Sequence, residues 1–353
     1  MAVDLAPAPG SLLSESHRRL PPWAPWVFGA GGLLVAWLVL LIAARPTIAG
    51  VVVLGAVLYA VGLTVTSYRV EGRRWATDRI ATTAVGGAFV LAMFPLVSLI
   101  WLVVSAGAER FSWTFLATDM VGVFGDMTEG GVAHAAIGTL LITLGATVIS
   151  VPIGILTAVY LVEYGRGHLA RAITFLVDVM TGIPSIVAGL FAFALLTLIL
   201  GPAYRSGFMG SVALAVLMTP VVIRSVEEML RIVPNELREA ALALGVPKWL
   251  MIVKVVLRTA IAGITTGVMI AIARVIGETA PLLLTAGLAT TINWDLFDGR
   301  MATLPVFAYR QYAQGGQGIP RAWAAALTLI LIVMLLNLVA RLVSRWFSPK
   351  TSA

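Results

Sequence analysis

The sequence predicts an all-α polytopic membrane protein with about eight transmembrane helices. The mean hydropathy is +0.97. Of the 353 residues, 59% are apolar and only 12% are charged. These values lie far outside the range of soluble globular proteins. Several apolar stretches also reach the roughly 20 residues that a helix needs to cross the hydrocarbon layer. The sequence contains no cysteine, so it excludes disulfides and thiolate metal sites.

Apolar segments of span length follow one another along most of the chain. We expect spans at residues 24–44, 48–67, 80–104, 134–162, 172–200, 208–229, 257–284 and 323–344. Residues 1–22 are polar and rich in proline, and we expect them to form a disordered cytoplasmic tail. This tail is unlike a cleaved signal peptide, because the apolar segment after it has span length and lacks a small-residue cleavage pattern.

The basic residues indicate how the predicted spans are oriented. With eight spans and a cytoplasmic N-terminus, sixteen of the 24 Lys and Arg residues fall on the cytoplasmic side and six fall outside. The other two, Arg224 and Arg274, lie within spans. Cytoplasmic loops of membrane proteins carry such an excess of positive charge. We therefore expect both termini to be cytoplasmic, and we attribute the net charge of +7 to the loops and not to nucleic-acid binding.

The first two predicted spans differ from the six that follow. They carry no internal charge, and a basic linker from Tyr68 to Arg79 separates them from the rest. We interpret residues 23–79 as an accessory transmembrane hairpin with its linker, and residues 80–347 as the main transmembrane domain. Proline kinks or breaks a helix, so prolines in the later spans favour irregular helices around a cavity. These prolines are Pro95, Pro152, Pro184, Pro220 and Pro281.

An amphipathic segment between the sixth and seventh predicted spans begins with Glu239-Ala240-Ala241 and continues to Gly245. Small alanines let a helix lie close to a partner, and glycine permits a sharp turn. Pro247 can then begin another helix. The alternative interpretation is an ordinary polar connection. The spacing resembles the EAA-x3-G loop of ABC-importer permeases, whose coupling helix docks into the ATPase subunit, and we expect that helix at residues 234–250. The family pattern has a proline where this chain has Arg258.

Three further segments resemble one family in particular. They are ARVIGETAPL at residues 273–282, MATLPVFAY at 301–309 and GIPSIVAGL at 182–190. All three resemble stretches of the PstA family, permease subunits of the phosphate-specific ABC importer. The resemblance covers roughly residues 80–345. It implies a type I ABC-importer (MetI-like) six-helix core in the lipid bilayer of the bacterial inner membrane. It also implies pairing with the sister permease PstC, two copies of the ATPase PstB and the external phosphate-binding protein PstS.

Charged residues within the spans are the candidates for a substrate pathway. A charge inside a span costs several kcal/mol unless it is paired or lines water. Arg224 is followed by Glu227 at i+3, and Arg274 is followed by Glu278 at i+4, so each arginine shares a helix face with a carboxylate. A planar guanidinium offers parallel donors to two phosphate oxygens. The alternative for each pair is a salt bridge that only fastens helices together.

The family resemblance adds Arg171 to these candidates. It aligns the pathway arginines of the family with Arg224 and Arg171, and it matches Glu227 to the acidic partner. Asp178 lies up to two turns into its span and is a weaker candidate. We therefore expect the pathway to include Arg224, Glu227, Arg274, Glu278 and Arg171, with inorganic phosphate as the substrate.

The sequence contains no segment that would bind ATP. The three lysines, Lys248, Lys254 and Lys350, do not follow a glycine, so the phosphate-cradling loop of ATPases is absent. We find no set of catalytic residues and expect no cofactor or metal. The chain is therefore expected to be a permease subunit and not an enzyme. Open alternatives are a permease for another oxyanion such as molybdate or sulfate, a secondary transporter, for which we see no inverted repeats, and a membrane scaffold.

Overall fold

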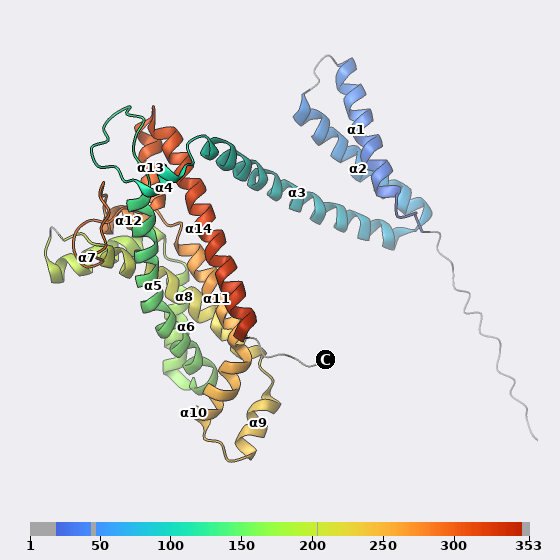
Figure 1. The fold of residues 1–353 in the computed structure, drawn as a ribbon. Coiled ribbons are helices and arrows are strands. Elements are labelled where there is room, and N and C mark those ends of the chain that lie inside the picture. The colour runs from blue at the N-terminus through green and yellow to red at the C-terminus, as the bar shows by residue number, and fades with distance from the viewer. Residues whose placement is uncertain (1–18, 44–46, 203, 348–353) are drawn as a thin grey trace, which may run out of the picture. The chain divides into compact units, whose positions relative to one another are not determined.

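The computed structural model describes residues 19–43, 47–202 and 204–347 (Figure 1). These residues form helices and connecting loops, and no strand occurs among them. The chain divides into two compact units, Met1–Leu99 and Ile100–Ala353. Most of the predicted tail lies outside the described residues. The predicted domain boundary between residues 79 and 80 stays a prediction.

The first unit begins with a helical hairpin. Helices α1 (Ala24–Ile42) and α2 (Ile48–Val70) pack against each other. They approach closely at Gly32 and Gly55, because a Cβ on Gly32 would lie only 2.8 Å from the carbonyl oxygen of Gly55. Small residues let membrane helices come together in this way. Helix α3 (Arg73–Ala108) starts three residues after α2 and is a single helix despite Pro95 within it.

A buried carboxylate holds the corner between α2 and α3. One oxygen of Glu71 accepts a hydrogen bond from the Ser67 hydroxyl at 2.6 Å. The other accepts from the Leu20 amide at 2.8 Å and pairs with Arg79 at 3.3 Å. Burial alone would raise the pKa of Glu71, but these hydrogen bonds and the Arg79 charge together bring the pKa below its ordinary value of 4.5. The corner is therefore stabilised by the ionised carboxylate.

Protonation of Glu71 should loosen this corner. Because its folded-state pKa is depressed, its contribution is present above pH 4.5 and is lost as the pH falls through the folded-state pKa. We expect Glu71→Gln to reduce amide-exchange protection of residues 67–79 roughly tenfold at pH 7, since charge-assisted hydrogen bonds become neutral ones. In the Glu71→Gln variant the amide-exchange protection of these residues should no longer fall as the pH is lowered, because glutamine does not titrate. The exposed neighbour Asp78, changed to Asn, is the matched control, and equal protection in both variants would contradict the assignment.

The second unit contains the end of α3 and a bundle of helices with two π-helical turns. They are α4 (Trp113–Ala117), α5 (Ala133–Val159), η1 (Tyr160–Tyr164), α6 (Gly167–Thr181), α7 (Ser185–Leu200), α8 (Gly207–Ile232), α9 (Asn235–Ala243), α10 (Lys248–Met251), η2 (Ile252–Val256), α11 (Leu257–Val275), α12 (Ala280–Thr285), α13 (Leu304–Gln314) and α14 (Gly318–Phe347). In this unit α9 and α10 lie at one end, and α4 and α13 lie at the other (Figure 1).

Helix α8 is the centre of the second unit and packs against α5, α11 and α7. Gly154 of α5 lets this helix come close, because a Cβ there would lie 2.5 Å from Cγ1 of Val222. The contacts form a buried apolar cluster that continues into α9, α10 and η2. Its members include Ile142, Met218, Val222, Val226, Leu230, Ala241, Met251 and Val256. This packing fixes α8, and with it the charged residues near its C-terminal end.

The membrane spans agree with the predicted fold class, with one break. Among the residues that the structure describes, seven helices are long and apolar enough to cross a membrane, or eight if α6 and α7 together form one span. The span predicted at residues 172–200 is broken, because α6 and α7 meet at a bend of 110°, next to one of the prolines that favour a kink or break. Gly182 ends α6 and Pro184 precedes α7. Proline disfavours a helical conformation in the residue before it, which explains the break.

The predicted helix at residues 257–284 also ends early. Helix α11 stops at Val275, and the short α12 begins only at Ala280. The ring of Pro281 would clash with the carbonyl group of Gly277 in a continuous helix, and the proline has no N–H to donate. Three other prolines in predicted spans lie inside helices that continue through them: Pro95 in α3, Pro152 in α5 and Pro220 in α8.

Candidate translocation and coupling sites

Four charged side chains from α6 and α8 form one cluster. The guanidinium of Arg224 donates to Glu227 at 2.8 Å and to Asp178. Glu227 also accepts from Arg231 at 2.6 Å. The spacing of Arg224, Glu227 and Arg231 places all three on one face of α8, and Asp178 reaches them from α6. Two positive and two negative groups therefore balance each other at this place.

The two carboxylates of the cluster are in different environments. The Glu227 side chain is 6% exposed and has both oxygens occupied, whereas Asp178 is 61% exposed. Arg224 itself is 31% exposed. A solvated carboxylate gives up its partner at less cost than a desolvated one. Asp178 is therefore the counter-ion that an incoming anion could replace on Arg224, while Glu227 stays in place.

Asp178 contributes more to the charged cluster than the sequence predicts. It was a weaker candidate outside the predicted site, yet the structure joins it to Arg224 across 46 positions of sequence. The available signal was a single acidic residue in an otherwise apolar stretch of α6. Such a residue usually has a partner inside the protein, but the sequence does not show on which helix that partner lies.

Arg171 lies on the same helix as Asp178 but does not join the cluster. Its guanidinium contacts His168 at 3.1 Å and the Gly167 carbonyl oxygen at 3.5 Å, both in the first turn of α6. Seven residues separate Arg171 from Asp178, which is about 10 Å along a helix and returns to the same face. Arg171 is exposed and lies nearer than Asp178 to the start of α6.

Arg274 and Glu278 do not form the expected ion pair. The prediction assumed one helix through both residues, but α11 ends at Val275 and Glu278 lies in the turn before α12. Among the described residues no ion pair joins the two side chains. Arg274 is exposed near the end of α11 that is distant from α9. Arg274 and Glu278 each remain candidates for a substrate pathway, at a different depth in the membrane from Arg224.

The segment predicted to form a coupling helix, residues 234–250, contains α9 and the start of α10, and a glycine ends α9. The amide of Val246 donates to the carbonyl of Ala241 at 3.2 Å, and that of Gly245 donates to Leu242 at 2.9 Å. This pair of bonds is the Schellman motif, which requires a left-handed residue. Gly245 supplies it, with φ of +76°. Pro247 then precedes α10, so the two short helices meet at a defined angle.

One side of α9 is anchored and the other is free in this chain. Ala241 is buried in the central apolar cluster. Glu239 and Ala240 are exposed, and so are the larger apolar side chains of Leu237, Leu242 and Leu244. Leu244 is 84% exposed at the tip of the turn. An exposed apolar surface next to carboxylates is typical of a docking site for another protein.

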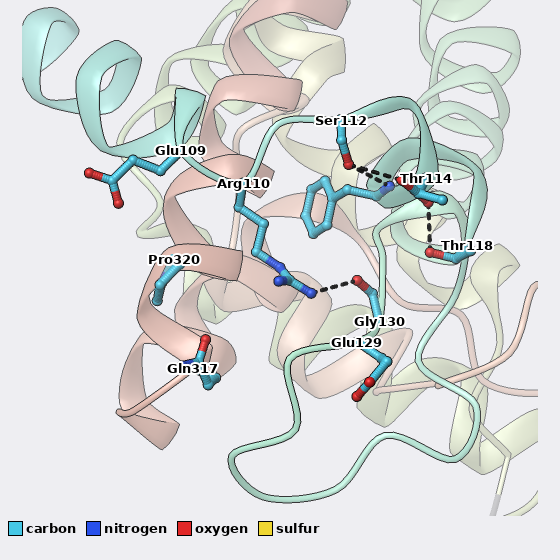
Figure 2. A pocket seen from close by; sticks show the side chains of 10 residues that line it. Glu109, Arg110, Ser112, Thr114, Thr118, Glu129, Gly130, Gln317 and Pro320 are labelled. Carbon is cyan, nitrogen blue, oxygen red and sulfur yellow. Dashed lines mark hydrogen bonds between the residues drawn. The ribbon is translucent and has the colours of Figure 1, made fainter.

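At the other end of the second unit, a cavity of about 570 Å³ lies between α4, the loop before α5 and the start of α14. Figure 2 shows Arg110 pointing across it to the Gly130 carbonyl oxygen, 3.3 Å away. A second bond goes to the carbonyl of Thr128. Arg110 therefore holds the loop over residues 118–132 in place through hydrogen bonds to backbone carbonyls, and these bonds occupy part of its guanidinium.

Known proteins match most of the chain. Residues 150–353 match the family described as "Binding-protein-dependent transport system inner membrane component". The phosphate transport system permease protein PstA 1 of Mycobacterium tuberculosis is 47% identical over 275 residues, which cover 77% of this chain and 90% of the relative. PstA of Mycobacterium leprae is 48% identical over 270 residues, covering 75% and 88%. A bacterial alginate ABC transporter chain has the same fold, with a TM-score of 0.54, 16% identity and coverage of 78% and 97%.

The helical bundle and the family match together define an inner-membrane permease component of a binding-protein-dependent transport system. The relatives narrow this class, and the chain belongs to the PstA family of phosphate transport system permease proteins. This result confirms the family resemblance of the sequence, the permease fold and the expectation that the chain is a transport subunit and not an enzyme.

Proposed function

We propose that this chain forms half of a pathway for inorganic phosphate across the bacterial inner membrane, and that α9 couples the pathway to an ATPase on another chain. The observation that carries the phosphate pathway is the Arg224 cluster. Its guanidinium is partly exposed and is shared between a buried and an exposed carboxylate. Phosphate could displace Asp178 and accept the same donors, because guanidinium groups bind phosphate and carboxylate oxygens with one geometry.

The carboxylates would let the anion leave again. An isolated arginine inside a membrane would hold phosphate strongly, whereas Asp178 competes for the same N–H groups and returns when phosphate moves on. Arg171 and Arg274 extend the proposed pathway to other depths, and Glu278 tempers the positive field near Arg274. Relatives named for phosphate transport favour phosphate over molybdate or sulfate, and membership of a binding-protein-dependent family disfavours a secondary transporter or a scaffold.

The end with α9 would face the cytoplasm. Basic residues gather there, which agrees with the positive charge of cytoplasmic loops. They include Arg166, Arg231, Arg238, Lys248, Lys254 and Arg258. With this orientation both termini are cytoplasmic, and the loop over residues 118–132 faces outside. Glu239, Ala240, Ala241 and Gly245 then shape a helix that an ATPase can receive in a groove with an apolar floor and a basic rim.

A permease of this class works with an ATPase and an external substrate-binding protein. The finer assignment that we propose is the sister permease PstC, two copies of PstB as the ATPase, and PstS as the binding protein. The test is reconstitution of the purified chain with these partners in vesicles. We expect uptake of labelled inorganic phosphate that requires ATP on the α9 side. Uptake without ATP, or uptake of sulfate and molybdate in preference to phosphate, would contradict the proposal.

A further inference from the structure

The connection between α8 and α9 is short. Helix α8 ends at Ile232 and α9 begins at Asn235, so only Val233 and Pro234 lie between them. Both have extended backbone angles. Proline fixes its own φ and restricts the residue before it, and Val233 is buried in the central apolar cluster, so the link is already restrained. If α9 receives the motion of an ATPase, polar contacts that join α9 to α8 would make this elbow stiffer still.

Arg238 of α9 spans the elbow. Its guanidinium donates to the carbonyl oxygen of Leu230 at 2.8 Å and to that of Val233 at 2.5 Å. These carbonyls belong to the C-terminal end of α8, where backbone acceptors have no partner in the helix and the helix dipole favours a cation. The Arg238 side chain is only 14% exposed. Helix α9 is therefore bound to the end of α8 by a charge that is largely shielded from solvent.

A carboxylate from another span holds that charge in position. Glu163 lies in η1, the π-helical turn that continues α5, and accepts from Arg238 at 3.0 Å. Its side chain is 6% exposed. Lys248 of α10 adds a second connection, because it donates to the Glu163 carbonyl and lies 4.5 Å from the ring centre of Tyr164. Helices α9 and α10 are thus tied to the ends of both α5 and α8.

We propose that the Arg238–Glu163 pair is the positioning element that makes α8 move with α9. Leu230 lies six residues beyond Arg224, about 9 Å along the same helix. A displacement of α9 that α8 follows would reach the Arg224 cluster directly. Without the pair, the elbow would absorb the displacement, and ATP would be hydrolysed without transport. The inference rests on the proposed docking of α9 to an ATPase.

The test compares transport with hydrolysis in reconstituted complexes of this chain with PstC, PstB and PstS. The readout is the number of inorganic phosphate ions imported per ATP hydrolysed. We expect Arg238→Gln to retain the ATPase and its activity but to lower this ratio about fivefold or more. Arg238→Lys should fall between, since an ammonium keeps the charge but cannot reach all three acceptors. Arg258→Gln, which changes an exposed arginine of α11, is the matched control and should leave the ratio unchanged.

A double-variant cycle strengthens the test. If the two residues act through one contact, Glu163→Gln combined with Arg238→Gln should lower the ratio no further than Arg238→Gln alone. Should Arg238→Gln fail to accumulate, Arg238→Lys serves in its place, because it keeps the charge next to Glu163 but cannot make all the bonds to α8. An unchanged ratio in an assembled variant would overturn the inference. Gly245→Asp in the same assay distinguishes the docking of α9 to an ATPase from the positioning role of Arg238. If Gly245→Asp also transports normally, the proposed docking of α9 is wrong, and the role of Arg238 that rests on it falls as well.

Discussion

Replacing Gly245 with aspartate should reduce phosphate uptake on the order of 100-fold, the size of effect found at the centre of protein interfaces. The chain should still insert and accumulate, because a Cβ at Gly245 meets nothing within 4 Å in this protein. The loss of uptake would arise from impaired docking to the ATPase and not from a defect in the fold of this chain. A charged group would enter the partner's groove next to Leu244, and the left-handed turn that aims α9 would be strained.

Two matched variants separate these causes. Asparagine has the shape of aspartate without its charge, and both tolerate a φ of +76° better than other residues. Gly245→Asn should therefore retain much more uptake than Gly245→Asp. Gly245→Ala adds backbone strain of about 1–2 kcal/mol with little bulk. Measuring uptake and co-purification of the ATPase for all three decides the matter, and wild-type values in Gly245→Asp would refute the docking of α9.

Features that depend on neighbouring residues were predictable from the sequence. The turn after α9 follows from local hydrogen bonds and from one glycine, so Glu239, Ala240, Ala241 and Gly245 could be placed on a helix and its cap. The spans could be predicted because hydropathy depends on composition alone.

Features that depend on a broken helix or on distant residues were not predictable in the same way. The Arg274–Glu278 pair was inferred from i+4 spacing. That spacing brings two side chains to one face only within a continuous helix, and Pro281 prevents α11 from continuing through Glu278. Asp178 and Arg224 meet only because α6 packs on α8. The same limit applies to Arg321, which precedes the predicted span at residues 323–344 but is 1% exposed within α14 and donates to Gln311 at 3.0 Å.

Neutralising Arg224 should cost about a hundredfold in phosphate uptake, and replacing it with lysine about tenfold, since each lost charge-assisted hydrogen bond is worth about 1.5–3 kcal/mol. Lysine keeps the charge but not the planar fork, and glutamine has neither. The complex should still assemble, because Glu227 keeps Arg231 as a partner and Asp178 is exposed enough to stay hydrated. Uptake is measured in reconstituted complexes at a saturating concentration of loaded binding protein.

The double variant Arg224→Gln with Asp178→Asn tests whether the cluster serves phosphate or only fastens helices. If the Arg224–Asp178 pair only joins α6 to α8, removing both charges keeps the cluster neutral, with Glu227 still paired to Arg231, and transport should recover together with assembly. If Arg224 donates to phosphate, the double variant should assemble normally and transport as poorly as Arg224→Gln. Asp178→Asn alone should then slow release of the anion and lower the maximal rate. Near-normal uptake by the assembled double variant would reduce the cluster to a structural ion pair.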